Sequence, residues 1–142
     1  MIEFEVLKEF SLSPNLVWGV VREVKDYPKY WHGTRELNVK EVDEGVFEGV
    51  ARLAFPAKVK VRVAVNDRER KLTVEYLEGI IRGFHTVEVL EHEIKSHWKV
   101  NLSPWLKPFE GRVKKHFMAG TNNALERILR EVSKQVQTLT AR

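Results

Sequence analysis

The sequence contains no cysteine, which excludes a disulfide framework, a thiolate nucleophile and any cysteine-ligated zinc site. Aspartate and glutamine are scarce, with 3 and 2 residues, whereas Glu, Lys and Arg are abundant, a bias that favours a thermophilic source. No apolar run approaches the ~20 residues that a membrane-spanning helix needs. The start of the chain, where Ile2 and Phe4 alternate with acidic residues, is unlike a signal peptide. We therefore expect a cytoplasmic protein.

The chain also has no long stretch of like charge, because acidic and basic residues interleave, and the net charge is only +4. A nucleic-acid-binding domain usually concentrates its basic residues on one face. The sequence gives no strong signal of nucleic-acid binding. The densest basic stretch has Lys58, Lys60 and Arg62 at alternate positions, with Arg62 expected opposite Glu75. This pattern favours a solvated sheet face, with a weak nucleic-acid or anionic-membrane surface as the alternative.

What the chain does have is apolar residues at every second position, the spacing of strands with one buried face. A first strand is predicted from Ile2 to about Leu12. Two short helices follow, one beginning at Ser13-Pro14 and one over Tyr27–Gly33.

Six further strands are predicted between Thr34 and Leu102. Glu44-Gly45, residues 67–70 and residues 78–83 supply turn signals between them. Because each strand is joined to the next by a short connection, the pattern indicates an antiparallel meander.

The apolar spacing changes to that of a helix after the segment 103–108, which carries two prolines. This helix is predicted over Phe109–Gln137, ~43 Å at 1.5 Å per residue. It cannot bury its apolar stripe on itself, and a flat sheet would meet it along one line only. We therefore expect an α+β fold, a single domain over residues 1–142, in which a curved antiparallel sheet of about seven strands wraps the helix.

Small residues in this scheme predict a space between sheet and helix. Gly120 lies inside the long helix, where glycine costs about 1 kcal/mol relative to alanine, and Gly49 and Ala51 are expected on the inner face of a strand. The alternative is that these small residues only complement large neighbours.

Two segments near the start of the chain, FSLSPNLVW over Phe10–Trp18 and VKDYPKYW over Val24–Trp31, are joined by a later glycine-bounded turn, Glu78–Arg82. Together with the order of the predicted elements, these features resemble the helix-grip superfamily. This superfamily includes the birch-pollen allergen, START lipid-transfer domains, and polyketide cyclase and coenzyme Q-binding proteins. The resemblance covers essentially the whole chain and implies a hydrophobic pocket between helix and sheet. It brings no universal catalytic residues, because fold does not determine function.

Strand and helix parity predicts which side chains line that pocket. The predicted ligand-binding residues are Trp31, Leu53, Val61, Val63, Tyr76, His85, Val87, Trp98, Phe117, Thr121 and Ala124. Two aromatic residues in loops, Phe55 and Trp105, are predicted to gate the entrance or to touch a membrane, with packing onto the long helix as the alternative.

His85 and Tyr76 are the titratable pair that parity places inward, so they are the candidates for a catalytic acid and base. The alternative is that each is a satisfied core residue. The five histidines lack the spacing that puts two ligands on one helix face, and no metal site is predicted. No phosphate loop, dinucleotide fingerprint or nucleophile elbow occurs, and no cofactor is predicted.

Two functions from different classes remain. The first is binding or carriage of a small apolar molecule, such as a lipid, an isoprenoid or quinone, or an aromatic compound, with a transient membrane contact. The second is a cyclase- or dehydratase-type enzyme that acts on a polyketide-like or aromatic substrate through Tyr76 and His85. The sequence favours the first, because it contains no strong polar constellation.

Overall fold

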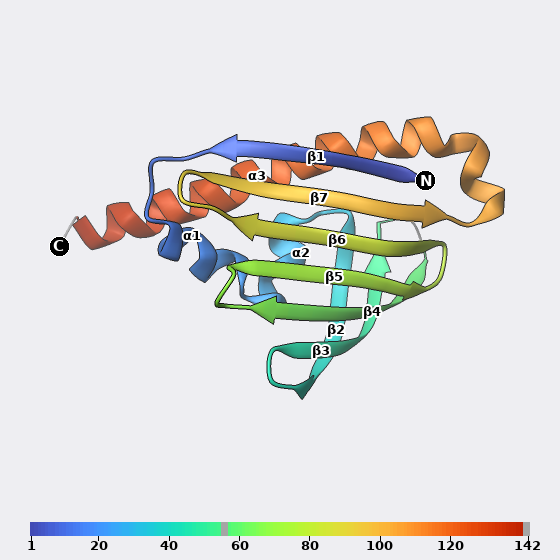
Figure 1. Ribbon diagram of the computed structural model, residues 1–142, viewed down its shortest axis with the longest axis horizontal. Coiled ribbons are helices and arrows are strands. Elements are labelled where there is room, and N and C mark those ends of the chain that lie inside the picture. Colours follow the sequence, from blue (N-terminus) through green and yellow to red (C-terminus); the bar gives the residue numbers. More distant parts are fainter. Residues whose placement is uncertain (55–56, 141–142) are drawn as a thin grey trace.

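A computed structural model describes residues 1–54 and 57–140 and shows a curved sheet wrapped around a long helix (Figure 1). In chain order the elements are β1 (Ile2–Glu9), α1 (Pro14–Val21), the 3₁₀ turn η1 (Val24–Asp26), α2 (Tyr27–Tyr30), β2 (Thr34–Asp43), β3 (Val46–Leu53), β4 (Lys58–Asn66), β5 (Lys71–Glu78), β6 (Ile81–Val89), β7 (Glu93–Leu102), the 3₁₀ turn η2 (Pro104–Phe109) and α3 (Glu110–Thr140). The predicted fold class is confirmed.

The strands form one antiparallel sheet in the order β1-β7-β6-β5-β4-β3-β2, so consecutive strands from β2 to β7 pair as hairpins. Gly45, with a φ of +70°, forms the turn between β2 and β3 that the sequence predicts. Arg62 lies opposite Glu75, as expected. Its guanidinium, however, contacts Glu48 on the other neighbouring strand, 3.4 Å away.

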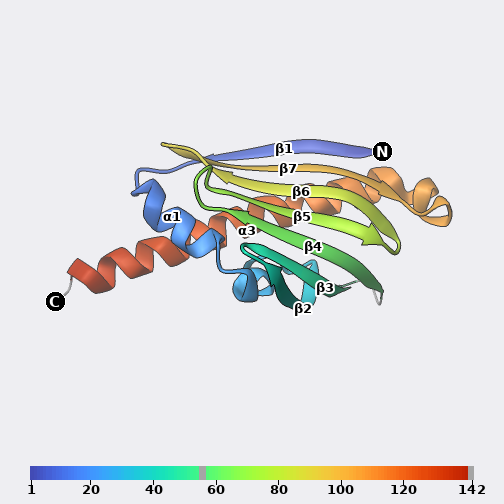
Figure 2. The same ribbon diagram turned by 60° about the horizontal axis from the view of Figure 1, so that its bottom comes forward.

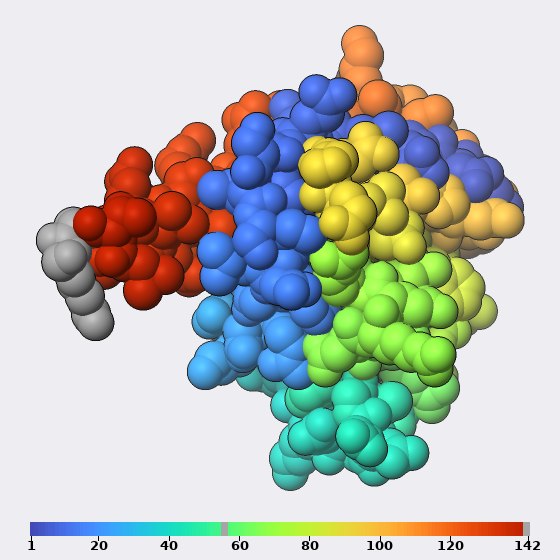
Figure 3. Space-filling view, turned by 60° about the vertical axis from the view of Figure 1, so that its left-hand side comes forward, coloured from blue at the N-terminus to red at the C-terminus, as the bar shows by residue number. Residues whose placement is uncertain are grey.

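The long helix α3 lies against the concave face of the sheet, with α1 and α2 on the same side (Figure 2). Its buried residues are Thr121, Ala124, Leu125, Ile128 and Val132, at the three- and four-residue spacing of one helix face. The C-terminal end of α3 projects beyond the sheet and the neighbouring helix α1 (Figure 3).

Several boundaries differ from the sequence-based prediction, among them the end of α3, which lies at Thr140 rather than Gln137, and the end of α2, which lies at Tyr30 rather than Gly33. β1 ends at Glu9 rather than near Leu12. β6 begins at Ile81, so Gly83 lies inside a strand and not in a turn. Gly83 has a φ of +133°, and a Cβ there would collide with the backbone carbonyl of Lys99 on β7, so the close approach of the two strands requires glycine. A further difference is the 3₁₀ turn η2 in the segment predicted as a loop.

Among the described residues no helix is both long and apolar enough to cross a membrane. That same part of the chain holds no cluster of three or more His, Asp or Glu side chains arranged to bind a metal ion.

Candidate functional site: a cavity between sheet and helix

A cavity of about 450 Å³ lies between the N-terminal half of α3 and the sheet. Its volume falls within the ~300–1,000 Å³ of typical small-molecule sites. Its lining comes from α2 and the segment after it, from β2, β3, β5, β6 and β7, and from η2 and α3. The lining residues are Tyr27, Trp31, His32, Gly33, Thr34, Leu53, Ala54, Tyr76, Ile80, Ile81, Trp98, Leu102, Leu106, Val113, His116, Phe117, Ala119, Gly120, Thr121, Asn123 and Arg127.

The exposed members of this lining mark the mouth of the cavity. They come from α3 on one side and from the segments after α2 and β3 on the other: His116, Ala119, Gly120, Asn123, His32, Gly33 and Ala54. Gly120 contributes to the opening, because a Cβ built there meets no atom within 4 Å. The glycine that the sequence analysis singled out therefore leaves room at the cavity.

Aromatic rings form the inner wall. The indole of Trp98 is central, with ring centroids 6.1 Å from stacked Tyr76, 5.0 Å from Phe117 and 6.4 Å from Trp31. Its Nε1 donates a 2.9 Å hydrogen bond to the Thr121 hydroxyl on α3. This bond fixes the indole across the space between sheet and helix, so the wall is preformed for a flat apolar ligand.

Behind this wall lies His85, whose side chain is completely buried. Its ring stacks on Trp98 at 3.8 Å and meets Trp31 edge-on at 4.4 Å between centroids. Both ring nitrogens are occupied: Nδ1 lies 2.9 Å from the Tyr27 hydroxyl, and Nε2 lies 2.7 Å from Ser96 Oγ. The imidazole is therefore held in one orientation from both sides.

Burial controls the ionisation of this cluster. Loss of solvent holds the pKa of His85 well below its ordinary value, and His97 lowers this pKa further. Burial likewise raises the pKa of Tyr27 well above its ordinary value. The pKa of Tyr76 rises to about 12 for the same reason, although the neighbouring side chains of Tyr27 and Thr34 oppose the rise. All three groups are consequently neutral at pH 7.

The predicted ligand-binding residues separate into two sets. Those that line the cavity are Trp31, Leu53, Tyr76, Trp98, Phe117 and Thr121. Those that do not line it, contrary to the prediction, are Val61, Val63, His85, Val87 and Ala124, all of them buried. Parity identified the inner face correctly for this second set. It could not tell which part of that face is covered by packed side chains and which part faces the space.

The predicted pairing of His85 with Tyr76 also needs correction. The hydroxyl that contacts His85 belongs to Tyr27 on α2, whereas Tyr76 stacks on Trp98 with ring centroids 6.1 Å apart. Tyr27 and Thr34 were missed, because parity relates residues of one sheet and gives no contact between a helix and the sheet. The Asp-Tyr-Pro segment that carried the family resemblance was the available signal.

The two predicted gate residues have different outcomes. Trp105 is 61% exposed, beside the cavity-lining Leu106. Its role as a gate stays a prediction. Phe55 lies outside the described residues.

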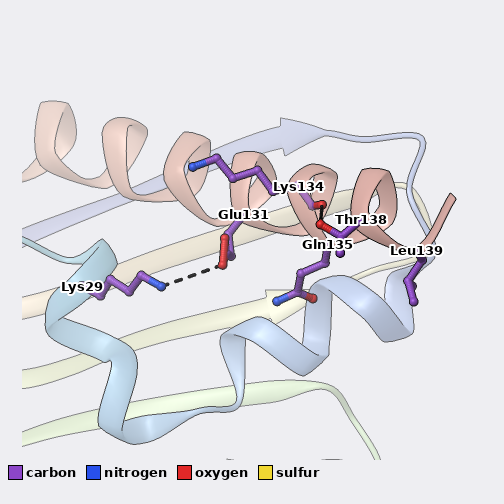
Figure 4. Close-up of a pocket in the computed structure, with 6 residues that line it drawn as sticks. All are labelled: Lys29, Glu131, Lys134, Gln135, Thr138 and Leu139. Atoms are coloured by element: carbon purple, nitrogen blue, oxygen red, sulfur yellow. Dashed lines mark hydrogen bonds and ion pairs between the residues drawn. The ribbon is translucent and has the colours of Figure 1, made fainter. Parts of the chain in front are cut away.

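A second hollow, of about 660 Å³, lies at the opposite end of α3 (Figure 4). Its lining residues are Lys29, Glu131, Lys134, Gln135, Thr138 and Leu139, and Lys29 lies 3.8 Å from the Glu131 carboxylate across it. This hollow is broad and lined mainly by polar side chains. The enclosed aromatic cavity is therefore the better candidate for a ligand site.

Comparison with known proteins places this geometry in context. The family described as polyketide cyclase/dehydrase and lipid transport matches residues 1–137. No curated protein is similar enough in sequence to be matched. Among solved structures, the Zhui aromatase/cyclase from a Streptomyces species has a TM-score of 0.72 at 14% identity, over 94% of each chain.

Two further structures are similar. A protein of Thermus thermophilus has a TM-score of 0.72 at 14% identity, over 94% of this chain and 98% of that chain. Norcoclaurine synthase from Thalictrum flavum, solved with dopamine and hydroxybenzaldehyde, has a TM-score of 0.63 at 19% identity, over 91% of this chain and 86% of that chain. At these identities the likeness concerns the fold, which is the helix-grip fold that the sequence resemblance implied.

Proposed function

The chain belongs to the polyketide cyclase/dehydrase and lipid transport family, and from this premise we propose that it binds a small, flat, largely apolar molecule in the cavity between α3 and the sheet. The observation that carries the proposal is the 450 Å³ space with an aromatic wall. Aromatic compounds and the rings of isoprenoid quinones fit it best, because they stack on Trp31, Trp98 and Phe117.

The ligand has a preferred orientation in this proposal. Tyr27, Tyr76 and Thr34 all line the cavity, so their hydroxyls are the groups that we propose to hold one oxygen of the ligand. The polar side chains His116, Asn123 and Arg127 border its other parts. A ligand with an apolar body and an oxygen at the hydroxyl cluster therefore satisfies the whole site.

Intrinsic fluorescence tests binding directly, because Trp31 and Trp98 both line the cavity. Titration with 1-naphthol should quench their emission in a saturable way. Phe117→Ala removes a ring that lies 5.0 Å from Trp98 and should weaken binding about tenfold. Lys115→Ala, on the exposed side of the same helix, is the matched control and should bind like the parent protein.

A cavity-filling variant provides the complementary test. Gly120→Leu adds a side chain at the cavity mouth, where a Cβ meets no atom within 4 Å, and should abolish quenching while the protein remains folded. Native mass spectrometry of the purified protein should also detect a bound small molecule that Gly120→Leu lacks. Unchanged affinity in both Phe117→Ala and Gly120→Leu would contradict binding in this cavity.

A cyclase- or dehydratase-type activity is the second candidate, favoured by the contact between the Tyr27 hydroxyl and His85 Nδ1. The lowered pKa of His85 makes it a weak base and the raised pKa values of the two tyrosines make them weak acids, so binding without chemistry is the better proposal. Deuterium exchange at the carbon next to the carbonyl of bound 1-tetralone distinguishes the two. If the parent protein accelerates this exchange and Tyr27→Phe does not, the result would favour an enzymatic function.

We further propose that an anionic membrane surface is the partner at the cavity mouth. Trp105, Phe109 and Met118 are 61%, 50% and 41% exposed, in the same segment as the cavity-lining Leu106 and Phe117. Glu110 is the one acidic residue between positions 103 and 118, where the basic residues are Lys107, Arg112, Lys114 and Lys115. Exposed aromatic residues among basic ones suit the interface of an anionic bilayer.

Sedimentation with vesicles tests this surface. The protein should co-sediment with vesicles that contain phosphatidylserine at low salt, and it should not co-sediment with neutral phosphatidylcholine vesicles. The double variant Trp105→Ala/Lys114→Gln should lose most of the binding. Leu139→Ala/Lys134→Gln removes the same kinds of group at the opposite end of α3 and should behave like the parent protein. Equal losses in the two double variants would contradict a specific docking surface.

A further inference from the structure

The two edges of the sheet are protected differently. β1 and β2 are its terminal strands, at opposite ends of the strand order (Figure 2). The edge at β1 is tied to α3, because the terminal amine of Met1 lies 3.1 Å from Glu110 and Lys8 lies 3.3 Å from Glu126. Among the ion pairs of the described residues, none joins β2 to a helix. The outer edge of β2 therefore presents backbone groups of the kind that pair with another chain.

The middle of β2 is regular enough to accept a further strand. Its register with β3 shifts once between residues 34 and 36 and once between residues 41 and 43. Residues 36–41 pair without interruption between these two irregularities, and the stretch contains no proline. Bulges and prolines are common means of blunting an edge strand. Here the irregularities lie only at the two ends, so the stretch between them stays open to pairing.

The charges of this stretch are complementary to those of a second copy of itself. When two β2 strands run antiparallel with Asn38 opposite Asn38, Glu36 of each strand faces Lys40 of the other. One position further out, Arg35 of each strand faces Glu41 of the other. Cross-strand pairs of opposite charge stabilise a sheet, and a two-fold axis at Asn38 makes each of these pairs occur twice.

The neighbouring registers lack this complementarity. A shift of one residue places Glu36 opposite Glu41 in one direction and Arg35 opposite Lys40 in the other, so like charges meet. Such a shift also turns the inner face of one strand toward the outer side of the other. The sequence of β2 therefore favours one register of self-pairing over those beside it.

The apolar residues of the inner face favour the same register. Two apolar rows cross β4, β3 and β2, and their members on β4 and β3 are buried, whereas those on β2 are only half-buried because no strand follows. In the register centred on Asn38, Leu37 of one copy faces Val39 of the other, so a second copy continues both rows. The rows are Val59–Ala51–Leu37 and Val61–Gly49–Val39.

We propose that the outer edge of β2 pairs with β2 of a second copy of this chain, antiparallel about a two-fold axis at Asn38. The two seven-stranded sheets then join into one continuous sheet. Each copy contributes one strand and a few side chains, which places the contact at the small end of protein interfaces. We therefore expect a dimer that dissociates in the micromolar range. The proposal is independent of ligand binding in the cavity.

Sedimentation velocity over a range of protein concentrations tests the dimer. The parent protein should pass from monomer to dimer as its concentration rises. Lys40→Glu places an acidic residue opposite Glu36, and Glu36→Lys places a basic residue opposite Lys40, so each variant should associate at least about tenfold more weakly. Lys60→Glu makes the same change of charge on β4, two strands away from the edge, and should dimerise like the parent protein.

A mixture of the two variants gives a result that loss of folding cannot imitate. Lys40→Glu has acidic residues at both positions and Glu36→Lys has basic ones, so an equimolar mixture should form a heterodimer. The double variant Glu36→Lys/Lys40→Glu exchanges the two charges and should dimerise like the parent protein.

Three outcomes would overturn the proposal. The first is a parent protein that stays monomeric at every concentration. The second is a dimer that persists undiminished in Lys40→Glu and Glu36→Lys while circular dichroism shows both variants folded, which would place the contact elsewhere. The third is a mixture of the two variants that stays monomeric.

Discussion

The two halves of α3 face the same sheet but meet it in different ways. In the N-terminal half, Val113 and Phe117 are only half-buried beside the cavity, and Gly120 adjoins open space. In the C-terminal half, Leu125 and Ile128 are at most 1% exposed within the packed core. One apolar stripe thus serves two purposes: the packed half stabilises the fold, so the other half can leave a space for a ligand.

The largest effect should follow a deletion in the packed half. Leu125→Ala should lower the free energy of unfolding by about 2–5 kcal/mol, because the buried methyl groups are lost and a void remains. Phe117→Ala should lower the free energy of unfolding by less, since the Phe117 ring already borders a cavity. Urea unfolding of both variants measures the difference. Equal losses would erase the distinction between the two halves.

Acidification should lower the stability of the whole protein, because His85 is completely buried in its neutral form. Because its pKa is lower in the folded than in the unfolded state, its contribution to stability is complete above an unfolded pKa of about 6.5 and declines as pH falls below that value. The slope approaches about 1.4 kcal/mol per pH unit for one proton. Unfolding curves from pH 7 to 5 measure it.

The exposed residue His116 provides the control for this pH dependence. His116→Gln should keep the slope of the parent protein, since that histidine is exposed at the cavity mouth. A flat profile in the parent protein between pH 7 and 5 would show that His85 protonates without cost.

A substitution in the cavity half should raise stability. Gly120→Ala should add up to about 1 kcal/mol, because alanine favours the helix and the added methyl meets no atom within 4 Å. Thermal unfolding should show a higher melting temperature. A lower one would indicate that the position needs glycine for a reason other than space.

The smallest effect should come from the projecting end of α3. Leu139 is 62% exposed, so Leu139→Ala should change stability by less than about 0.5 kcal/mol. The same urea titration checks this value against Leu125→Ala, which removes the same atoms from the packed half.

Periodicity was sufficient for the sheet and the long helix but not for the interior between them. The alternation around Val61 and Val63 identified an inward face, yet these side chains pack in the core while Leu53 reaches the cavity. Whether an inward residue meets atoms or space depends on how far the helix lies from each point of the sheet. That distance is set by the whole fold and cannot be predicted from the spacing of apolar residues within one strand.

The polar cluster illustrates the same limit. Parity placed His85 and Tyr76 inward, and both lie there. The hydroxyl of Tyr27 arrives from α2, 58 residues away in sequence from its partner His85. A helix residue has no register with a sheet, so this contact could be known only from the assembled structure.

The pairing of β1 with β7 makes the order of folding unusual for a meander. Ile2 lies opposite Val100, so the first strand of the chain completes its hydrogen bonds only with the last. During synthesis β1 leaves the ribosome before its partner exists, and at about 5–20 residues per second it waits several seconds. The charged side chains of Glu3 and Glu5 on its exposed face discourage pairing with other chains during that interval. Docking of β1 is therefore expected to be a late and slow step, limited by closure of the long loop between Glu9 and Glu93.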